Sequence, residues 1–288
     1  MSAEVRSRYA QLEQRFVDWA QSRADIRSAI VIGSRARTDP PPDDWSDLDI
    51  ILYAVDPQIY AQNTGWLGKL GEIWLTVLNE TFAKEKEWLV LFEGGLKVDF
   101  VLSTATGPLQ AMLEQSPYRI VLRRGVRLLF DKERTAAELT IPKRWQRSSK
   151  PPTRGEFLAT INDFFLRATR TARLLKRGER WQAIEQCNGR LKQCLLTMMM
   201  WHAQAVKGAK HDTWYEGRHL DQWADPTTLD SIPATFAAYD TADLWRALFA
   251  TLALFRQLAT AAADRLGYPY PTKVDRQISQ WLVDQHRH

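Results

Sequence analysis

The chain has 288 residues and a mass of 33.2 kDa, with 45% hydrophobic residues, 25% charged residues, a net charge of +5 and a pI near 9.2. This composition is that of a globular protein and excludes a disordered or fibrous chain. The apolar runs fall short of the roughly 20 residues that cross a bilayer, and the charged start MSAEVRSRYA lacks a signal-peptide core. We therefore expect a cytoplasmic protein that contacts no membrane.

The first half of the chain shows one helical pattern followed by several strand patterns. Apolar residues recur at helical intervals from Val5 to Trp19. The β-branched run Ile26 to Ile32 then predicts a strand that stops at Gly33, and a second strand follows a proline-rich loop. The predicted strands are 26–32, 48–53, 73–78, 88–92 and 97–102, the last two joined by a turn at 93–95.

The second half is dominated by patterns of long helices. The polar, proline-bearing stretch 143–155 predicts a linker. Helices are expected at 156–176, 181–205, 243–266 and 273–284, the third capped at Asp240 or Thr241 and stopped by Gly267. The sequence thus predicts an α+β domain over residues 1–145, with a mixed sheet and flanking helices, and an α-helical bundle over 146–288.

Carboxylates gather on the predicted strands. Five aspartates occur between Asp39 and Asp49, where mutual repulsion is tolerated if the cluster is solvated or holds cations. Asp47 and Asp49 are two residues apart, so they share one strand face at a spacing of about 6.6 Å. Asp99 lies opposite the apolar face of a later strand. Carboxylate oxygens are ligands that Mg²⁺ prefers, so the three residues predict a site for one or two ions.

The stretch GSRAR follows the first strand and offers groups that suit a phosphate. Gly33 allows close backbone approach, Ser34 supplies a hydroxyl, and Arg35 and Arg37 supply charge-assisted contacts. Each of these elements is weak alone, since a Gly-Ser pair is usually an ordinary turn and an acidic block is usually a solvated loop. Their joint order along the chain favours a metal and phosphate site.

Three segments resemble a known family. GSRARTDPPPDDWSDLDI and LFEGGLKVDFVL look like the nucleotidyltransferase fold of DNA polymerase β type. The C-terminal segment, which begins YDTADLWRALF and ends RLGYPYP, resembles the aminoglycoside 6-adenylyltransferases, also called streptomycin adenylyltransferases. The resemblance covers almost the whole chain.

The resemblance implies transfer of AMP from Mg²⁺-ATP to a hydroxyl of a cationic antibiotic, with streptomycin the expected acceptor and pyrophosphate the second product. It implies that Asp47 and Asp49 ligate the metals and that Asp99 ligates the catalytic metal or takes the proton of the attacking hydroxyl. Gly33, Ser34 and Arg35 are expected to bind the nucleotide.

Further expected site residues lie in the acidic loop and the helical half. Lys192 and Arg218 are predicted to reach the triphosphate. Asp44 is expected to meet a cationic acceptor, as are Asp39 and Asp43, and Trp214 and Tyr215 are expected to wall the acceptor or adenine pocket. Other acidic candidates for the acceptor are Glu85, Glu87, Glu93 and Asp221.

Several alternatives stay open at this level. The basic net charge leaves the acceptor undecided between streptomycin, another antibiotic such as a lincosamide, and an unrelated molecule. Adenylylation of a protein side chain is a second hypothesis, and nucleotide binding without catalysis is a third. We expect no nucleic-acid partner, because no basic stripe with interleaved aromatic residues is evident. Monomer and homodimer are both compatible with the sequence.

Overall fold

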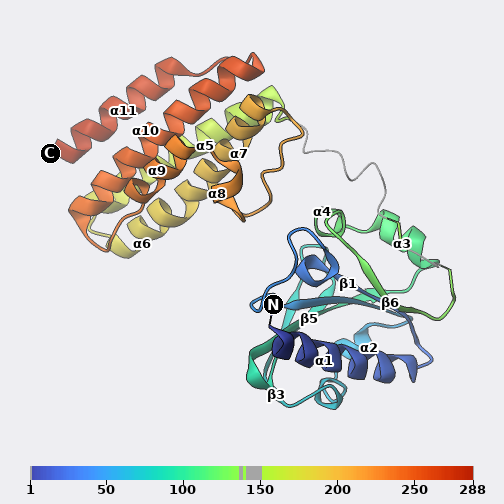
Figure 1. Cartoon of the computed structure of the whole chain (residues 1–288). Helices are drawn as coiled ribbons and strands as arrows, with labels where there is room; N and C mark the ends of the chain where they lie inside the picture. The colour runs from blue at the N-terminus through green and yellow to red at the C-terminus, as the bar shows by residue number, and fades with distance from the viewer. Residues whose placement is uncertain (1, 136–138, 141–150, 288) are drawn as a thin grey trace. The chain divides into compact units, whose positions relative to one another are not determined.

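The structure is a computed structural model that describes residues 2–135, 139–140 and 151–287 (Figure 1). Its contacts divide the chain into two compact units, residues 1–147 and 148–288. The first unit contains a mixed sheet with flanking helices and the second is helical, which confirms the expected α+β fold class. Within the described residues, no helix combines the length and the apolar character needed to span a membrane.

The sheet of the first unit has six strands in the order β3-β4-β5-β2-β1-β6. β2 and β5 are parallel, and the other neighbouring pairs are antiparallel. The strands are β1 (Ile26–Ile32), β2 (Leu48–Ala54), β3 (Ile73–Glu80), β4 (Lys86–Phe92), β5 (Leu96–Thr104) and β6 (Arg127–Asp131). The five strands that the sequence predicts are confirmed with ends shifted by two residues or fewer. β6 was not predicted, because its five residues begin and end with a charge.

Helices cover both faces of this sheet. α1 (Ala3–Gln21) buries Leu12 and Phe16 against one face, where Leu48, Ile50 and Leu52 of β2 also lie. The opposite face is covered by the short helices α3 (Leu109–Gln115) and α4 (Arg119–Leu122), which pack on Ile51 and other residues of that face. Smaller helical turns occur at α2 (Gln58–Ala61), Gly33–Ala36, Leu67–Lys69 and Glu93–Gly95. The alternation of side chains along β2 therefore separates a face against α1 from a face that carries Asp49.

The second unit is built on long amphipathic helices. It comprises α5 (Arg154–Lys176), α6 (Arg180–Ile184), a π-helical turn (Glu185–Arg190), α7 (Leu191–Lys207), α8 (Leu220–Trp223), α9 (Pro226–Thr235), α10 (Thr241–Leu266) and α11 (Thr272–Arg287). α10 begins at the predicted cap Asp240 and ends at Gly267 in a left-handed conformation. The core includes a stacked pair, Phe164 on α5 and Phe255 on α10, whose ring centres are 3.7 Å apart.

Two expectations for this half need correction. The helix predicted over 181–205 is divided by the π-helical turn into α6 and α7. The linker predicted at 143–155 is too long at its end, because Thr153 and Glu156 form a reciprocal capping box that starts α5 at Arg154. Residues 143–150 of that linker lie outside the described residues. The short helices α8 and α9 were not predicted.

Candidate active site

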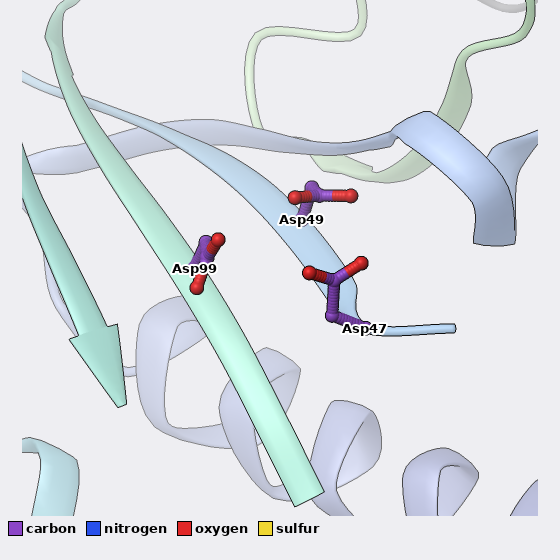
Figure 2. Close-up of side chains that lie close together, drawn as sticks. All are labelled: Asp47, Asp49 and Asp99. Carbon is purple, nitrogen blue, oxygen red and sulfur yellow. The ribbon is translucent and has the colours of Figure 1, made fainter. Parts of the chain in front are cut away.

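The parallel pairing of β2 and β5 brings the predicted aspartates together. Asp49 and Asp99 are direct partners in the register of the two strands, and Asp47 directly precedes β2. Figure 2 shows the three side chains directed to the same side of the sheet. One carboxylate oxygen from each residue lies within 4.8 Å of the others. The spacing of the D-x-D pair and the strand alternation around Asp99 thus converge in one carboxylate cluster, defined here as Asp47, Asp49 and Asp99.

The carboxylate cluster begins where the apolar cover of its sheet face ends. Ile51 and Val101, two residues further along each strand, belong to the buried cluster under α3 and α4. Asp49 and Asp99 are not part of that buried cluster and are only partly buried. The same face of the sheet therefore changes from apolar to acidic within one register step of the parallel pair.

Gly33 is required at the turn beside the cluster for two reasons. Its φ of +71° lies in the region that favours glycine. In addition, a Cβ at this position would overlap Oδ2 of Asp49. Glycine at position 33 therefore lets the backbone of the turn after β1 lie closer to the Asp49 carboxylate than a residue with a side chain would allow.

Burial and nearby negative charge favour the protonated forms of Asp49 and Asp99. Burial raises the pKa of Asp49 to about 7, and the charges of Asp47 and Asp99 act in the same direction. Burial also raises the pKa of Asp99, although the nearby Lys97 opposes the shift. Such shifts mean that the ionised cluster is costly in the protein without an added positive charge.

Lys97 supplies one positive charge to the cluster. Its Nζ lies 2.9 Å from Oδ2 of Asp47 and 2.7 Å from Oδ2 of Asp99. Lys97 was not predicted as a site residue, although it lies two positions before Asp99 on the same strand and so shares its face. The strand alternation that placed Asp99 would also have placed Lys97.

Tyr9 connects Lys97 to the loop that carries Asp47. The Tyr9 hydroxyl accepts a hydrogen bond from the backbone N–H of Lys97 at 3.1 Å and lies 3.3 Å from the Lys97 carbonyl. The guanidinium of Arg35 stacks on the Tyr9 ring at 3.5 Å and donates to the carbonyl of Ser46 at 2.6 and 3.1 Å. Helix α1 thus contributes to positioning both β5 and the residue before Asp47.

The residues of the cluster fit a divalent cation. The donors are carboxylate oxygens, which Mg²⁺ prefers. Oδ1 of Asp99 is buried and has no hydrogen-bond partner among the described residues. A buried carboxylate oxygen without a partner is costly unless a ligand satisfies it. Asp47, Asp49 and Asp99 are therefore the residues that would hold a metal ion.

Several other predicted residues of the turn and loop have partners within the protein. The Ser34 hydroxyl lies 3.5 Å from the carbonyl of Asp47, at the limit of a hydrogen bond. Asp43 accepts from the backbone N–H of Trp45 at 3.0 Å and from the Ser46 hydroxyl at 2.8 Å, and the Ser46 contact lowers the pKa of Asp43. Asp44 accepts from the backbone N–H of Ser2. Arg35 and Asp43 thus shape the loop in this structure.

Glu85 and Glu87 lie on the same sheet face as Asp99 but differ in their partners. Glu85 accepts hydrogen bonds of 2.6 Å from the hydroxyls of Ser103 and Tyr118. Glu87 has a weaker contact, 3.4 Å from Nδ2 of Asn79, and its pKa is raised by burial and then by the charge of Asp99. Of the two glutamates, Glu87 is the one whose charge is coupled to the cluster.

Lys192 lies in the second unit, at the start of α7. Its ammonium donates to the carbonyl of Cys187 at 2.8 Å and to the Thr251 hydroxyl at 2.9 Å, and burial lowers its pKa to about 8. Cys187 belongs to the π-helical turn, where the regular hydrogen bonding of an α-helix is interrupted. Lys192 is therefore a partly buried cation that bridges this turn to α10.

The loop between α7 and α8 carries three further predicted residues, Trp214, Tyr215 and Arg218. The guanidinium carbon of Arg218 is 5.0 Å from the centre of the Tyr215 ring, and Arg218 is exposed. Trp214 packs against the core of the unit and lies 4.3 Å from the His219 ring. Tyr215 and Arg218 thus form a contacting pair, while much of Trp214 serves packing.

The site combines the glycine turn at Gly33 with a carboxylate cluster suited to a divalent cation. This arrangement is that of a nucleotidyltransferase. Comparison with known proteins agrees, because the family model described as streptomycin adenylyltransferase matches residues 6–285. The chain belongs to the streptomycin adenylyltransferase family, a family of enzymes, which confirms the resemblance noted in the sequence.

Individual relatives match over most of their length. The aminoglycoside 6-adenylyltransferase of Bacillus subtilis (strain 168) is 27% identical over 267 residues, which cover 89% of this chain and 90% of that protein. The Campylobacter jejuni protein of the same name is 26% identical, with coverages of 94% and 93%. A crystal structure of an aminoglycoside 6-adenyltransferase from Bacillus subtilis matches with 22% identity and a TM-score of 0.45, covering 94% of this chain and 96% of that one.

Proposed function

We propose that this enzyme transfers AMP from ATP to a hydroxyl of an aminoglycoside, with streptomycin the expected acceptor, and releases pyrophosphate. The observation that carries the proposal is the cluster of Asp47, Asp49 and Asp99 oxygens within 4.8 Å in a member of this family. The relatives named aminoglycoside 6-adenylyltransferase support the acceptor class.

The proposed reaction is a substitution at the α-phosphorus of ATP. The acceptor oxygen forms a bond to the α-phosphorus, and the bond from that phosphorus to the oxygen bridging to the β-phosphate breaks. Magnesium bound to the cluster would neutralise phosphate charge and promote the attack of the hydroxyl. Asp47 and Asp49 would hold this ion together with Asp99. The proton of the hydroxyl goes to Asp99, whose buried Oδ1 has no hydrogen-bond partner among the described residues, or directly to solvent.

The nucleotide contacts extend the same proposal. The backbone at Gly33 and the hydroxyl of Ser34 would bind the terminal phosphates, with Arg35 contributing charge beside them. Lys192 and Arg218 would bind the triphosphate. The protonated form of Lys192 is needed for this, and its pKa of about 8 leaves it mostly charged at neutral pH.

A cationic acceptor would be held by carboxylates outside the metal set. Glu87 is suited to this role because it is half-buried, is coupled to Asp99 and has only a long contact to Asn79. A half-buried carboxylate of this kind is stabilised by a cationic partner. Asp44 would add charge from the loop, and Trp214 and Tyr215 would contribute aromatic surface.

The test is pyrophosphate release from Mg²⁺-ATP with streptomycin, spectinomycin, kanamycin or lincomycin, comparing the wild type with Asp49→Asn. Release with streptomycin that is lost in the variant supports both the chemistry and the acceptor. Release with lincomycin or another compound alone keeps the chemistry and changes the acceptor. If ATP binds but no compound drives release, the small-molecule proposal fails and protein acceptors become the target.

A further inference from the structure

The position of Lys97 within the carboxylate cluster leads to an inference about metal binding. Its ammonium contacts Oδ2 of Asp47 and Oδ2 of Asp99 at 2.9 and 2.7 Å. Asp47 and Asp99 are two of the three residues whose oxygens would surround a divalent cation. The ammonium therefore pairs with two of the three carboxylates that would hold the metal.

The charges of the site show why a cation is held there. Lys97 brings one positive charge to three carboxylates, and the neighbouring Glu87 adds a fourth acidic group. The ammonium is a compact charge that binds carboxylates without the planar geometry of arginine. It partly neutralises the cluster, but Oδ1 of Asp99 still has no partner among the described residues.

The side chain of Lys97 can leave the cluster while its backbone remains fixed. The Lys97 side chain is 45% exposed, so solvent can hydrate the ammonium when it moves. Its backbone N–H is bound by the Tyr9 hydroxyl at 3.1 Å, and the strand is paired on both sides by β2 and β4. Movement would then be confined to the flexible lysine side chain and would leave Asp99 in register with Asp49.

We infer that Lys97 is a built-in counter-cation of the metal site, which stabilises the cluster before a divalent cation enters and is displaced from Asp47 and Asp99 when it binds. This inference rests on the proposed function, because it requires that the cluster hold a metal. Lys97 therefore lowers the affinity of the cluster for a divalent cation, and it stabilises the enzyme when no divalent cation is bound.

The experiment replaces Lys97 with an uncharged side chain of similar length, Lys97→Met. A matched control is Lys86→Met on the adjacent strand, whose ammonium pairs with Glu80 at the same 2.9 Å distance that joins Lys97 to Asp47 but away from the cluster. Mn²⁺ binding is measured by electron paramagnetic resonance of the free ion. Melting temperatures of all variants are measured with and without MgCl₂.

For Lys97→Met we expect Mn²⁺ binding that is tighter by about fivefold, because the ion no longer competes with an ion pair. Without added cation the variant should melt about 3 °C lower than the wild type, and saturating Mg²⁺ should remove or reverse that difference. Lys86→Met should show the wild-type affinity and the wild-type response to Mg²⁺.

Two results would overturn the inference. Unchanged Mn²⁺ affinity in Lys97→Met would show that the ammonium and the ion do not compete, and weaker affinity would show that Lys97 positions the carboxylates for the ion. Asp49→Asn separates these results from a failure of the proposed function: if the wild type binds Mn²⁺ no better than Asp49→Asn, the cluster is not the metal site and both proposals fail.

Discussion

Glu85, directly before β4, and Asp99, on β5, lie on the same face of the sheet, yet their carboxylates have different partners. Glu85 receives hydrogen bonds from the hydroxyls of Ser103 and Tyr118. Asp99 has one oxygen paired with Lys97 and another that is buried without a partner among the described residues. The first carboxylate is satisfied by neutral donors of the fold, whereas the second leaves an acceptor atom for something else.

This difference indicates how one sheet face serves both stability and chemistry. The end of this face that carries Glu85, called here the Glu85 end, lies beside Tyr118, which joins the apolar cluster under α3 and α4. The end that carries Asp47, Asp49 and Asp99, called here the cluster end, combines partly buried like charges with raised pKa values for Asp49 and Asp99. Unfavourable charge burial of this kind is concentrated at functional sites because a ligand can relieve it. Substitutions at the two ends should therefore have separable effects.

Gly33→Ala should give the largest effect, at the cluster end. The added Cβ would overlap Oδ2 of Asp49 in a backbone conformation with φ of +71°, so the carboxylate must shift. A displacement of about 1 Å can reduce turnover by roughly 100-fold, and we expect a loss of that size in AMP transfer. The control is Gly95→Ala, where a Cβ meets no atom within 4 Å although φ is also positive. Equal losses in both variants would attribute the effect to backbone strain alone.

Glu87→Gln should give an intermediate effect that is confined to the acceptor. Removing the charge that would meet a cationic acceptor should raise the KM for that acceptor by about tenfold and leave the KM for ATP unchanged. Steady-state kinetics with each substrate varied in turn measures the KM for the acceptor and the KM for ATP separately. The matched variant Glu85→Gln should leave both constants near their wild-type values, and an increase in the KM for ATP in Glu87→Gln would contradict the assignment.

Tyr118→Phe should give the smallest effect on activity and should act on stability. The variant loses the hydroxyl that lies 2.6 Å from Glu85 and 2.7 Å from Thr81. A hydrogen bond to a charged group contributes about 1.5 kcal/mol, so the free energy of unfolding should fall by that amount while AMP transfer stays within about twofold. Denaturant unfolding and the activity assay on one preparation test this, and a large loss of activity without destabilisation would remove the distinction between the two ends.

The sequence predicts much of the first unit because its signals are local. The helical spacing from Val5 to Trp19 and the alternation along β2 and β5 depend only on residues near each other, and both are found in the structure. β6 was missed because its short sequence becomes a strand only by pairing with β1. The π-helical turn was missed because the sequence pattern through 185–190 continues that of an α-helix.

The candidate site likewise has features that the local sequence predicts and features that it does not. The convergence of Asp47, Asp49 and Asp99 follows from strand alternation once β2 and β5 are adjacent. The partners of individual side chains are not local, so the sequence did not indicate that Glu85 would be satisfied by Tyr118, or that Arg35 would stack on Tyr9 and bind the carbonyl of Ser46. Lys97 is the one omission that alternation alone could have corrected.

The central claim, that Asp99 takes part in nucleotidyl transfer, is tested most directly by Asp99→Ala. One preparation is used to measure Mg²⁺-ATP binding by calorimetry and AMP transfer, by mass spectrometry, to the acceptor that the wild type modifies. We expect transfer to fall by at least about 100-fold while ATP still binds, because a positioned proton acceptor contributes on that scale. Transfer at a rate close to that of the wild type would contradict the claim.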